Sequence, residues 1–296
     1  MNSLASRLVA TAAKMLLACS LISNSSALAN HNLLPDEQLD IQRRTEAINK
    51  DPGNAAKYFS RGEALQYLDE HAQAIQDFSK AIKLAPSNSH SYYSRAYSYA
   101  TLEKYQEALA DLNWIIKKDP KNRPARNQIG VIYMAMGKVD DAIALYSLML
   151  KENKHDTDSL ANRAAAYERQ KRYEDAVKDL DLAVVASPYE TKFFRDRAED
   201  LGKLKRWKEA IRDYSKAIEM DSENVGDFEH RAQARMLDGD PKNALVDYSQ
   251  AIKMEPEFAS AYLGRAQVYE KLGNVAKARE DRAIAAKLQQ DKGKDK

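Results

Sequence analysis

The side chains most often used for metal binding are few in this chain of 296 residues and poorly spaced for that task. The histidines are His31, His71, His90, His155 and His230. No two of them stand at the i, i+4 spacing that places two zinc ligands on one helix face. Cys19 is the only cysteine, so thiolates cannot complete a site. The sequence therefore predicts no metal site.

Motifs for catalysis and cofactor binding do not occur in the sequence either. It contains no glycine-rich phosphate loop, no GxSxG nucleophile motif and no dinucleotide-binding fingerprint. Carboxylates are abundant, but on helices they mostly solvate an outer face or pair with a base four residues away. We expect a chain that is not an enzyme and that uses no cofactor.

One pair of opposite charges recurs at a fixed interval of 34 residues. The arginines are Arg61, Arg95, Arg163, Arg197, Arg231 and Arg265, and the aspartates sixteen residues after them are Asp77, Asp111, Asp179, Asp213, Asp247 and Asp281. At the register that lacks both charges, Ile129 and Leu145 take their places. A charge left alone at a partly buried contact is costly, so the joint loss indicates that the two positions touch. We predict a structural Arg–Asp ladder.

The same interval organises the rest of the chain. The segments QDFSKAIKLA, RDYSKAIEMD and VDYSQAIKME begin at residues 76, 212 and 246, and seven registers begin at residues 55, 89, 123, 157, 191, 225 and 259. The twentieth position is alanine in all seven: Ala74, Ala108, Ala142, Ala176, Ala210, Ala244 and Ala278. The eighth position is always glycine or alanine. Two small residues per register allow two helices to approach closely.

Larger residues and prolines complete each register. Aromatic residues occupy the fourth position in five registers, and proline occupies the thirty-second in four: Pro86, Pro120, Pro188 and Pro256. A proline there ends one helix before the next begins. Within the sixth register, Asp240 is a predicted N-cap, with Pro241 in the first turn of the helix.

This pattern of small, aromatic and proline positions resembles the tetratricopeptide repeat. The resemblance implies an all-α fold, a right-handed superhelical α-solenoid of antiparallel helix pairs with a concave groove. Seven repeats are expected over residues 55–292, after an N-terminal segment, 30–54, that holds a capping helix at 36–50. A polar tail, 293–296, follows a last repeat whose outer face is wettable.

Residues 1–29 differ in kind from the repeats. Arg7 and Lys14 precede an apolar run, and the segment ends in Ala-Leu-Ala without any acid. This order predicts a secretory signal peptide cleaved before Asn30, which would place the protein in a bacterial periplasm. One alternative is a lipid anchor at Cys19, because LLAC resembles a lipoprotein box. The others are secretion and a mitochondrial presequence.

The charge balance argues against nucleic acid as a partner. Removing residues 1–29 removes two bases and no acid, which leaves 44 of each. A nucleic-acid binder needs a basic face, because contacts with phosphates supply much of its affinity. No apolar run after residue 30 is long enough to span a bilayer.

The resemblance also implies where a partner would bind. In this family the groove is lined mainly by positions 2, 5, 9 and 12 of each first helix. In the first three repeats these positions include Phe59, His90, Tyr93, Tyr97, Asn127, Val131 and Met134, a surface suited to an extended peptide or a helix. In the later repeats these positions include Asp158, Glu168, Lys192, Arg195, Glu199, Glu229, Gln233 and Gln267, a polar and charged surface.

A second surface is expected on the convex side. The twenty-sixth position is Trp114, Leu148 and Leu182 in three consecutive repeats, whereas it is Lys80, Lys216 and Gln250 in others. An exposed apolar strip marks a partner site, here a homodimer or a membrane-associated complex. The alternative is that these residues pack against adjacent helices.

Two classes of function remain open at this point. The first is a non-catalytic scaffold or adaptor that binds proteins of the cell envelope in its groove. The second is an accessory or substrate-binding subunit of a polysaccharide or cell-wall enzyme complex, and a secreted protein that acts on host cells is a weaker third. Apolar groove positions favour a peptide, whereas aromatic platforms ringed by acids and amides favour carbohydrate.

Overall fold

The computed structural model describes residues 35–294, and in that range it contains fifteen helices and no strand. The helix α2 (Pro35–Lys50) stands where the capping helix is expected. The predicted signal peptide lies outside the described residues. The chain is an all-α repeat solenoid in which consecutive helix pairs pack in a row.

Fourteen helices follow α2 as seven pairs. The first helices are α3 (Ala55–Tyr67), α5 (Ser89–Thr101), α7 (Arg123–Ala135), α9 (Thr157–Arg169), α11 (Thr191–Lys203), α13 (Val225–Leu237) and α15 (Ala259–Lys271). The second helices are α4 (His71–Leu84), α6 (Tyr105–Lys118), α8 (Val139–Glu152), α10 (Tyr173–Ala186), α12 (Trp207–Met220), α14 (Pro241–Met254) and α16 (Val275–Lys294). Each first helix begins at the residue where its register begins. The last helix extends to Lys294, beyond the residue at which a polar tail was expected.

Asparagine caps explain why the first helices start where they do. Asn54, Asn88, Asn122 and Asn224 each precede a first helix, and each side chain accepts a hydrogen bond from a backbone N–H of the first turn. Such a cap satisfies an amide that has no partner within the helix. The predicted cap at Asp240 is confirmed, because its side chain accepts from the N–H of Asn243.

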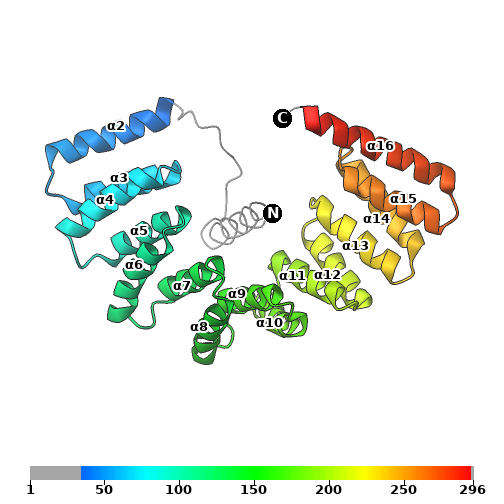
Figure 1. The fold of residues 1–296 in the computed structure, drawn as a ribbon, viewed down its shortest axis with the longest axis horizontal. Helices are drawn as coiled ribbons and strands as arrows, with labels where there is room; N and C mark the ends of the chain where they lie inside the picture. The colour runs from blue at the N-terminus through cyan, green and yellow to red at the C-terminus, as the bar shows by residue number, and fades with distance from the viewer. Residues whose placement is uncertain (1–34, 295–296) are drawn as a thin grey trace. The chain divides into compact units, whose positions relative to one another are not determined.

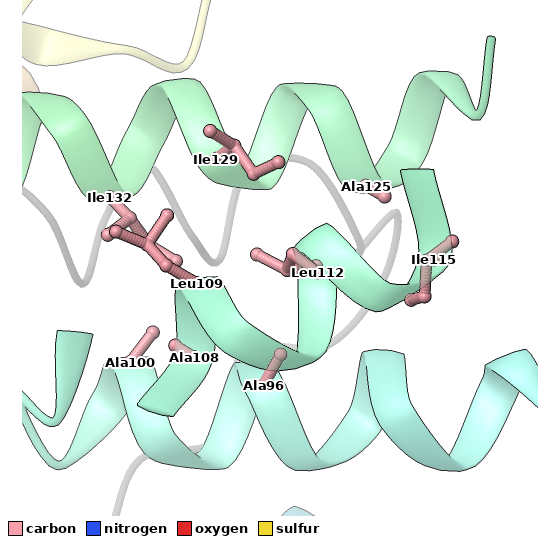
Figure 2. Packing of buried hydrophobic residues seen from close by; sticks show 9 residues of the cluster. All are labelled: Ala96, Ala100, Ala108, Leu109, Leu112, Ile115, Ala125, Ile129 and Ile132. Atoms are coloured by element: carbon pink, nitrogen blue, oxygen red, sulfur yellow. The ribbon is translucent and has the colours of Figure 1, made fainter. Parts of the chain in front are cut away.

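The described residues divide into two compact units, 35–152 and 153–294, whose helices are labelled in Figure 1. In the first unit, α2 packs on α3, and each helix from α3 to α8 packs on its neighbour in the chain. Figure 2 shows part of its core, where Ala96 of α5, Leu112 of α6 and Ile129 of α7 meet. Leu112 is fully buried. The small residue at position 8 thus lets the second helix lie close to the first.

The second unit repeats this packing from α9 to α16. One of its core clusters joins Ala198 and Leu201 of α11 to Tyr214 of α12, and another joins Phe228, Tyr248 and Val268. The alanines at position 20 are 0–1% exposed in all seven repeats. Any larger side chain there would overlap the facing helix.

The six expected charge pairs are all present as two-point salt bridges. In every pair, Nε and Nη2 of the arginine donate to the two carboxylate oxygens of the aspartate at 2.7–3.0 Å. The six aspartates are at most 7% exposed. Each pair joins the first helix of a repeat to its second helix, which makes the ladder a part of the fold.

The third guanidinium nitrogen connects each of five repeats to the helix before it. Nη1 donates to Thr45, Ser79, Asp181, Ser215 and Ser249, which are sixteen residues before their arginines. Aromatic rings at position 4, such as Tyr92 beside Arg95 and Phe228 beside Arg231, lie 5.7–5.8 Å from the guanidinium carbon. One arginine therefore joins three helices.

The third repeat replaces this pair by an apolar contact. Ile129 is 3% exposed within the core cluster, and Leu145 packs against the same cluster. The exchange is physically allowed because no charge remains unpaired.

Removing one member of a ladder pair is expected to be far more harmful than removing both. Arg95→Ile and Asp111→Leu should each lower the free energy of unfolding by about 3 kcal/mol, because each leaves a buried charge alone. The double variant copies the third repeat and should be more stable than either single variant. A double-mutant cycle from denaturant unfolding measures this coupling.

The exposed pair Arg172–Asp175 provides the matched control, because its side chains are 47% and 33% exposed. The same substitutions there should change the free energy of unfolding by less than about 1 kcal/mol. Equal effects at both pairs would show that burial of the ladder contributes nothing.

Two glycines in first helices should respond to alanine with opposite signs. A Cβ at Gly130 would overlap the ring of Tyr146, which is 0% exposed and cannot move aside, so Gly130→Ala should cost about 1–3 kcal/mol. At Gly202 the nearest atom, on Trp207, would be 3.6 Å away, so Gly202→Ala should stabilise the helix by about 0.5–1 kcal/mol. Thermal unfolding of the two variants decides the signs.

Candidate functional site

The first-helix face of the first unit is defined here by the predicted residues of α3, α5 and α7. Tyr93 and Tyr97 lie one turn apart on α5, and both are half-buried. Tyr93 packs against the core cluster of Figure 2, and the ring of Tyr97 lies 6.1 Å from that of His71. Burial raises the pKa of both hydroxyls. Each tyrosine therefore has one packed side and one accessible side.

Two further residues of this face differ in exposure. Phe59 on α3 is half-buried, with its ring 5.6 Å from that of Phe78. His90 is exposed in the first turn of α5, where its backbone N–H donates to Asn88 Oδ1. Burial raises the pKa of Glu63, and the nearby Arg44 and His90 oppose that rise. An acid on α3 thus lies near His90 of α5.

Helix α7 contributes less of the predicted surface than expected. Asn127 and Val131 are half-buried, but Met134 is only 6% exposed and belongs to the core. The expectation that Met134 lines an accessible groove is therefore wrong. It occupies position 12. At that position in α3, the side chain of Gln66 contacts the next first helix instead of pointing into solvent.

Several buried polar atoms near this face have no hydrogen-bond partner within residues 35–294. They are Ser91 Oγ, Asn127 Oδ1 and both the Oε1 and Nε2 atoms of Gln128. Gln128 is 4% exposed, so its amide is removed from bulk water without a protein partner. An unmade buried hydrogen bond costs about 1–3 kcal/mol, and such groups require an explanation.

The predicted convex residues are not equally available. Trp114 is half-buried, because its ring stacks on Tyr92 at 3.8 Å and the ammonium of Lys118 lies 4.4 Å from its centroid. Leu148 on α8, in the first unit, is 51% exposed, and Leu182 on α10, in the second unit, is 44% exposed. Trp114 is thus mostly covered by its own repeat, whereas the two leucines are accessible.

Polar first-helix residues of the second unit form ion pairs of their own. Arg195 on α11 donates through Nε to Asp227 at 2.9 Å and through Nη2 to Asp221 at 2.7 Å. Asp227 is 2% exposed. Arg195 therefore joins two consecutive repeats, which gives it a structural role in addition to its predicted place on the groove.

Three carboxyl groups lie together on the first helices α9 and α11. Burial raises the pKa of Glu168 to about 8, and the neighbouring Asp200 and Asp196 add to that rise. Burial likewise raises the pKa of Asp200 to about 7 and that of Asp196 to about 6. Acids crowded in this way hold protons near neutral pH unless a cation joins them.

Within the described residues, no three histidine or acidic side chains are arranged to hold a metal ion. In the same range, no helix is both long and apolar enough to cross a membrane.

Three family models match separate parts of the chain. Two, both described as tetratricopeptide repeat, match residues 55–88 and 99–158, and one described as TPR repeat matches 232–273. The chain is a tetratricopeptide repeat protein. A search of curated proteins found no match.

Solved structures share the fold at low sequence identity. A tetratricopeptide repeat protein from Parabacteroides merdae has a TM-score of 0.58 at 17% identity, and the match covers 79% of this chain and 93% of that one. MamA has a TM-score of 0.54 at 21% identity, covering 56% and 97%. MamA residues 41 to the end from Desulfovibrio magneticus RS-1 give 0.52 at 17%, covering 57% and 96%. These likenesses concern the fold alone.

The tetratricopeptide register did not single out Gln128, Asp196 or Asp200. They stand at positions 6 and 10 of their first helices, which pack between neighbouring repeats and do not belong to the groove positions of the family. A chemical signal could have found Asp200, because position 10 is small or apolar in the other six repeats, whereas position 6 is polar in most repeats and gives no such signal.

The acids on α9 and α11 should make stability depend on pH in a defined direction. A carboxyl whose pKa is raised by folding stabilises the protein fully below its unfolded pKa, about 4.3 for glutamate, and that contribution is lost as the pH rises through the folded value. Glu168→Gln removes the titrating carboxyl group, so the variant does not lose this stability as the pH rises. The variant's Tm should therefore rise above that of the wild type between pH 5 and pH 8, by about 2–4 °C at pH 8.

The exposed Glu174→Gln on α10 is the control, and its difference from the wild type should stay constant over the same range. A Tm difference for Glu168→Gln that does not grow with pH would contradict the burial of this carboxyl. Thermal unfolding followed by circular dichroism at each pH measures both variants.

Proposed function

We propose that the protein is a non-catalytic scaffold of the cell envelope that binds a segment of a partner protein on the first-helix face of α3, α5 and α7. The family supports the general role, because tetratricopeptide repeats serve as protein-interaction modules. The envelope location rests on the basic, then apolar, then small-residue order of residues 1–29.

One observation carries the choice of this face. Tyr93 and Tyr97 lie one turn apart on α5 and are half-buried, and the neighbouring first helix α7 carries Asn127, whose Oδ1 is buried without a partner in the described residues. An extended peptide offers an N–H and a C=O at every residue, and its side chains can pack on aromatic rings. The face thus offers aromatic rings for side chains, and the tyrosine hydroxyls and the half-buried Asn127 are the polar groups nearest to a main chain bound there.

A second candidate function uses the same residues differently. Tyrosine rings together with the half-buried amide of Asn127 also suit a carbohydrate chain, whose hydroxyls both donate and accept hydrogen bonds. The partner would then be a polysaccharide, and the protein would be an accessory subunit of a cell-wall enzyme complex.

Site-specific photo-crosslinking in the native cell distinguishes these functions. A photoreactive amino acid replaces Tyr93 in one variant, Trp114 in a second and Lys216, on the outer side of α12, in a third as the control. A protein adduct from Tyr93 well above the Lys216 level is the expected result. The same mass spectra give the mature N-terminus, which should be Asn30.

Each other outcome changes the proposal. A glycan adduct from Tyr93 would favour the carbohydrate function. Adducts from Trp114 to a second copy of this chain would identify a homodimer through the outer face. Equal yields at all three positions would reject the first-helix face as a binding site.

A further inference from the structure

One cavity in the second unit has no part in the proposed function. It has a volume of about 190 Å³ and is lined by residues of α10, α11 and α12 and by the residue before α12. Its base is apolar, because Val177 and Leu201 line it and are 4% and 3% exposed. Arg206 and Arg212 also line it and are exposed, so the cavity opens to solvent. We call it the fifth-repeat cavity.

Four other repeats have a tyrosine at the position of Leu201. This is position 11 of the repeat, and the tyrosines are Tyr99, Tyr133, Tyr167 and Tyr269. Tyr167 of the fourth repeat is half-buried, and its ring centroid lies 4.4 Å from the guanidinium carbon of Arg172 and 5.8 Å from that of Arg163. One tyrosine ring thus lies beside two guanidinium groups.

The fifth repeat keeps both arginines although it lacks the ring. Arg197 and Arg206 stand 34 residues after Arg163 and Arg172, and both line the fifth-repeat cavity. A leucine side chain is smaller than that of tyrosine, so it leaves space between the two guanidinium groups and the apolar base. The fifth-repeat cavity is therefore the place of a missing aromatic ring.

The other two repeats without this tyrosine do not reproduce the arrangement. In the sixth repeat, position 11 is Arg235, whose Nη1 donates to Asp247 Oδ2 at 2.7 Å, so a long side chain is already present. In the first repeat it is Leu65, but Glu70 stands where the fifth repeat has Arg206. Among the seven repeats, only the fifth combines leucine at position 11 with both arginines.

The charges around the cavity are balanced, which favours a neutral ligand. Three acids and three bases line it: Asp181, Glu209, Asp213, Arg197, Arg206 and Arg212. Arg197 donates to both Asp181 and Asp213 at 2.7 Å. Arg206 donates to Glu209 through two bonds of 2.7 Å. A charged ligand would disturb this balance, whereas a neutral ring would leave it intact and be attracted to the guanidinium groups.

We infer that the fifth-repeat cavity binds the tyrosine side chain of a partner protein, in the place that four other repeats fill with their own tyrosine. The volume is sufficient, because a cavity of about 150 Å³ holds benzene. Asp181, whose side chain is 57% exposed, uses Oδ1 for Arg197. Its Oδ2 is left to accept a hydrogen bond from the phenol hydroxyl, which selects tyrosine over phenylalanine. The site is independent of the face of α3, α5 and α7.

Methyl NMR of the full chain tests this site with N-acetyl-L-tyrosinamide as the probe. The methyl signals of Val177 should shift with the probe concentration until they reach a plateau, which gives the dissociation constant. N-acetyl-L-phenylalaninamide lacks the hydroxyl group and should bind about 2- to 10-fold more weakly.

The variant Leu201→Tyr fills the cavity with the residue of the other repeats. It should weaken binding of the probe by about tenfold or more, because the ring position is no longer empty. It should also fold, since four repeats accept tyrosine there, and circular dichroism and Tm verify this. The control is Leu65→Tyr, the same substitution at position 11 of the first repeat, which should leave the dissociation constant unchanged.

A second variant tests the guanidinium without changing the core. Arg206→Gln alters an exposed residue and should weaken binding of the probe by about 2- to 5-fold, because one cation beside the ring is lost. Its control is Arg172→Gln, which alters the equivalent arginine in a repeat whose own Tyr167 is present. That variant should bind the probe as the wild type does.

A peptide library tests whether the tyrosine belongs to a protein. Random twelve-residue peptides displayed on phage are selected on the wild type after depletion on Leu201→Tyr. The selected peptides should contain a tyrosine whose replacement by alanine abolishes binding. Selected peptides without such a tyrosine overturn the assignment to a protein partner.

The remaining outcomes are equally decisive. Val177 signals that do not shift, or equal binding by the wild type and Leu201→Tyr, overturn the site. Tighter binding of N-acetyl-O-phospho-L-tyrosinamide or of adenosine than of N-acetyl-L-tyrosinamide overturns the assignment to a neutral tyrosine. None of these results depends on photo-crosslinking from Tyr93, so failure of this site and failure of the proposed function are distinguishable.

Discussion

The buried two-point salt bridge between position 7 and position 23 is the interaction on which the arrangement of helices depends. An aspartate that is at most 7% exposed cannot remain charged without a partner, and the guanidinium supplies two parallel donors to it. A third nitrogen donates to the preceding helix in five repeats. Because the guanidinium is planar and rigid, these three bonds set the second helix of one repeat, its first helix and the preceding helix against one another. Lysine, a single point charge, could not do this.

The ladder joins the two helices of a repeat without using the groove positions of the first helix, although Arg195 at one of these positions joins two repeats. The small residue at position 8 and the ion pair at position 7 join the helices of a repeat, so positions 2, 5 and 9 are not needed for that purpose. The two units use this freedom differently. The first carries Tyr93 and Tyr97 at these positions, and the second carries Arg195 and Glu199.

Buried polar atoms without partners occur near the candidate surfaces in both units. Asp200 in α11 stands at position 10, where the other six repeats carry small or apolar residues, so the fold does not need its polarity. Gln128 in α7 stands at position 6, which is Ser, Asn, Asp or His in five of the six other repeats. Each of these unpaired buried groups costs stability.

The sequence alone determined the fold, the helix starts and the charge pairs of this protein. Because the 34-residue pattern occurs seven times, the helix positions could be assigned from all repeats together. The joint replacement of Arg and Asp by Ile129 and Leu145 predicted from the sequence that the two positions are in contact. Only the tertiary structure decided which predicted surface residues are accessible. Met134 is buried and Trp114 is covered by Tyr92, although both stand at positions assigned to a surface. The physical reason is that a register gives the direction of a side chain, whereas its exposure depends on the size and placement of neighbours from other repeats. Asp200 shows the same limit, because its burial beside Glu168 arises from residues 32 positions apart in the chain.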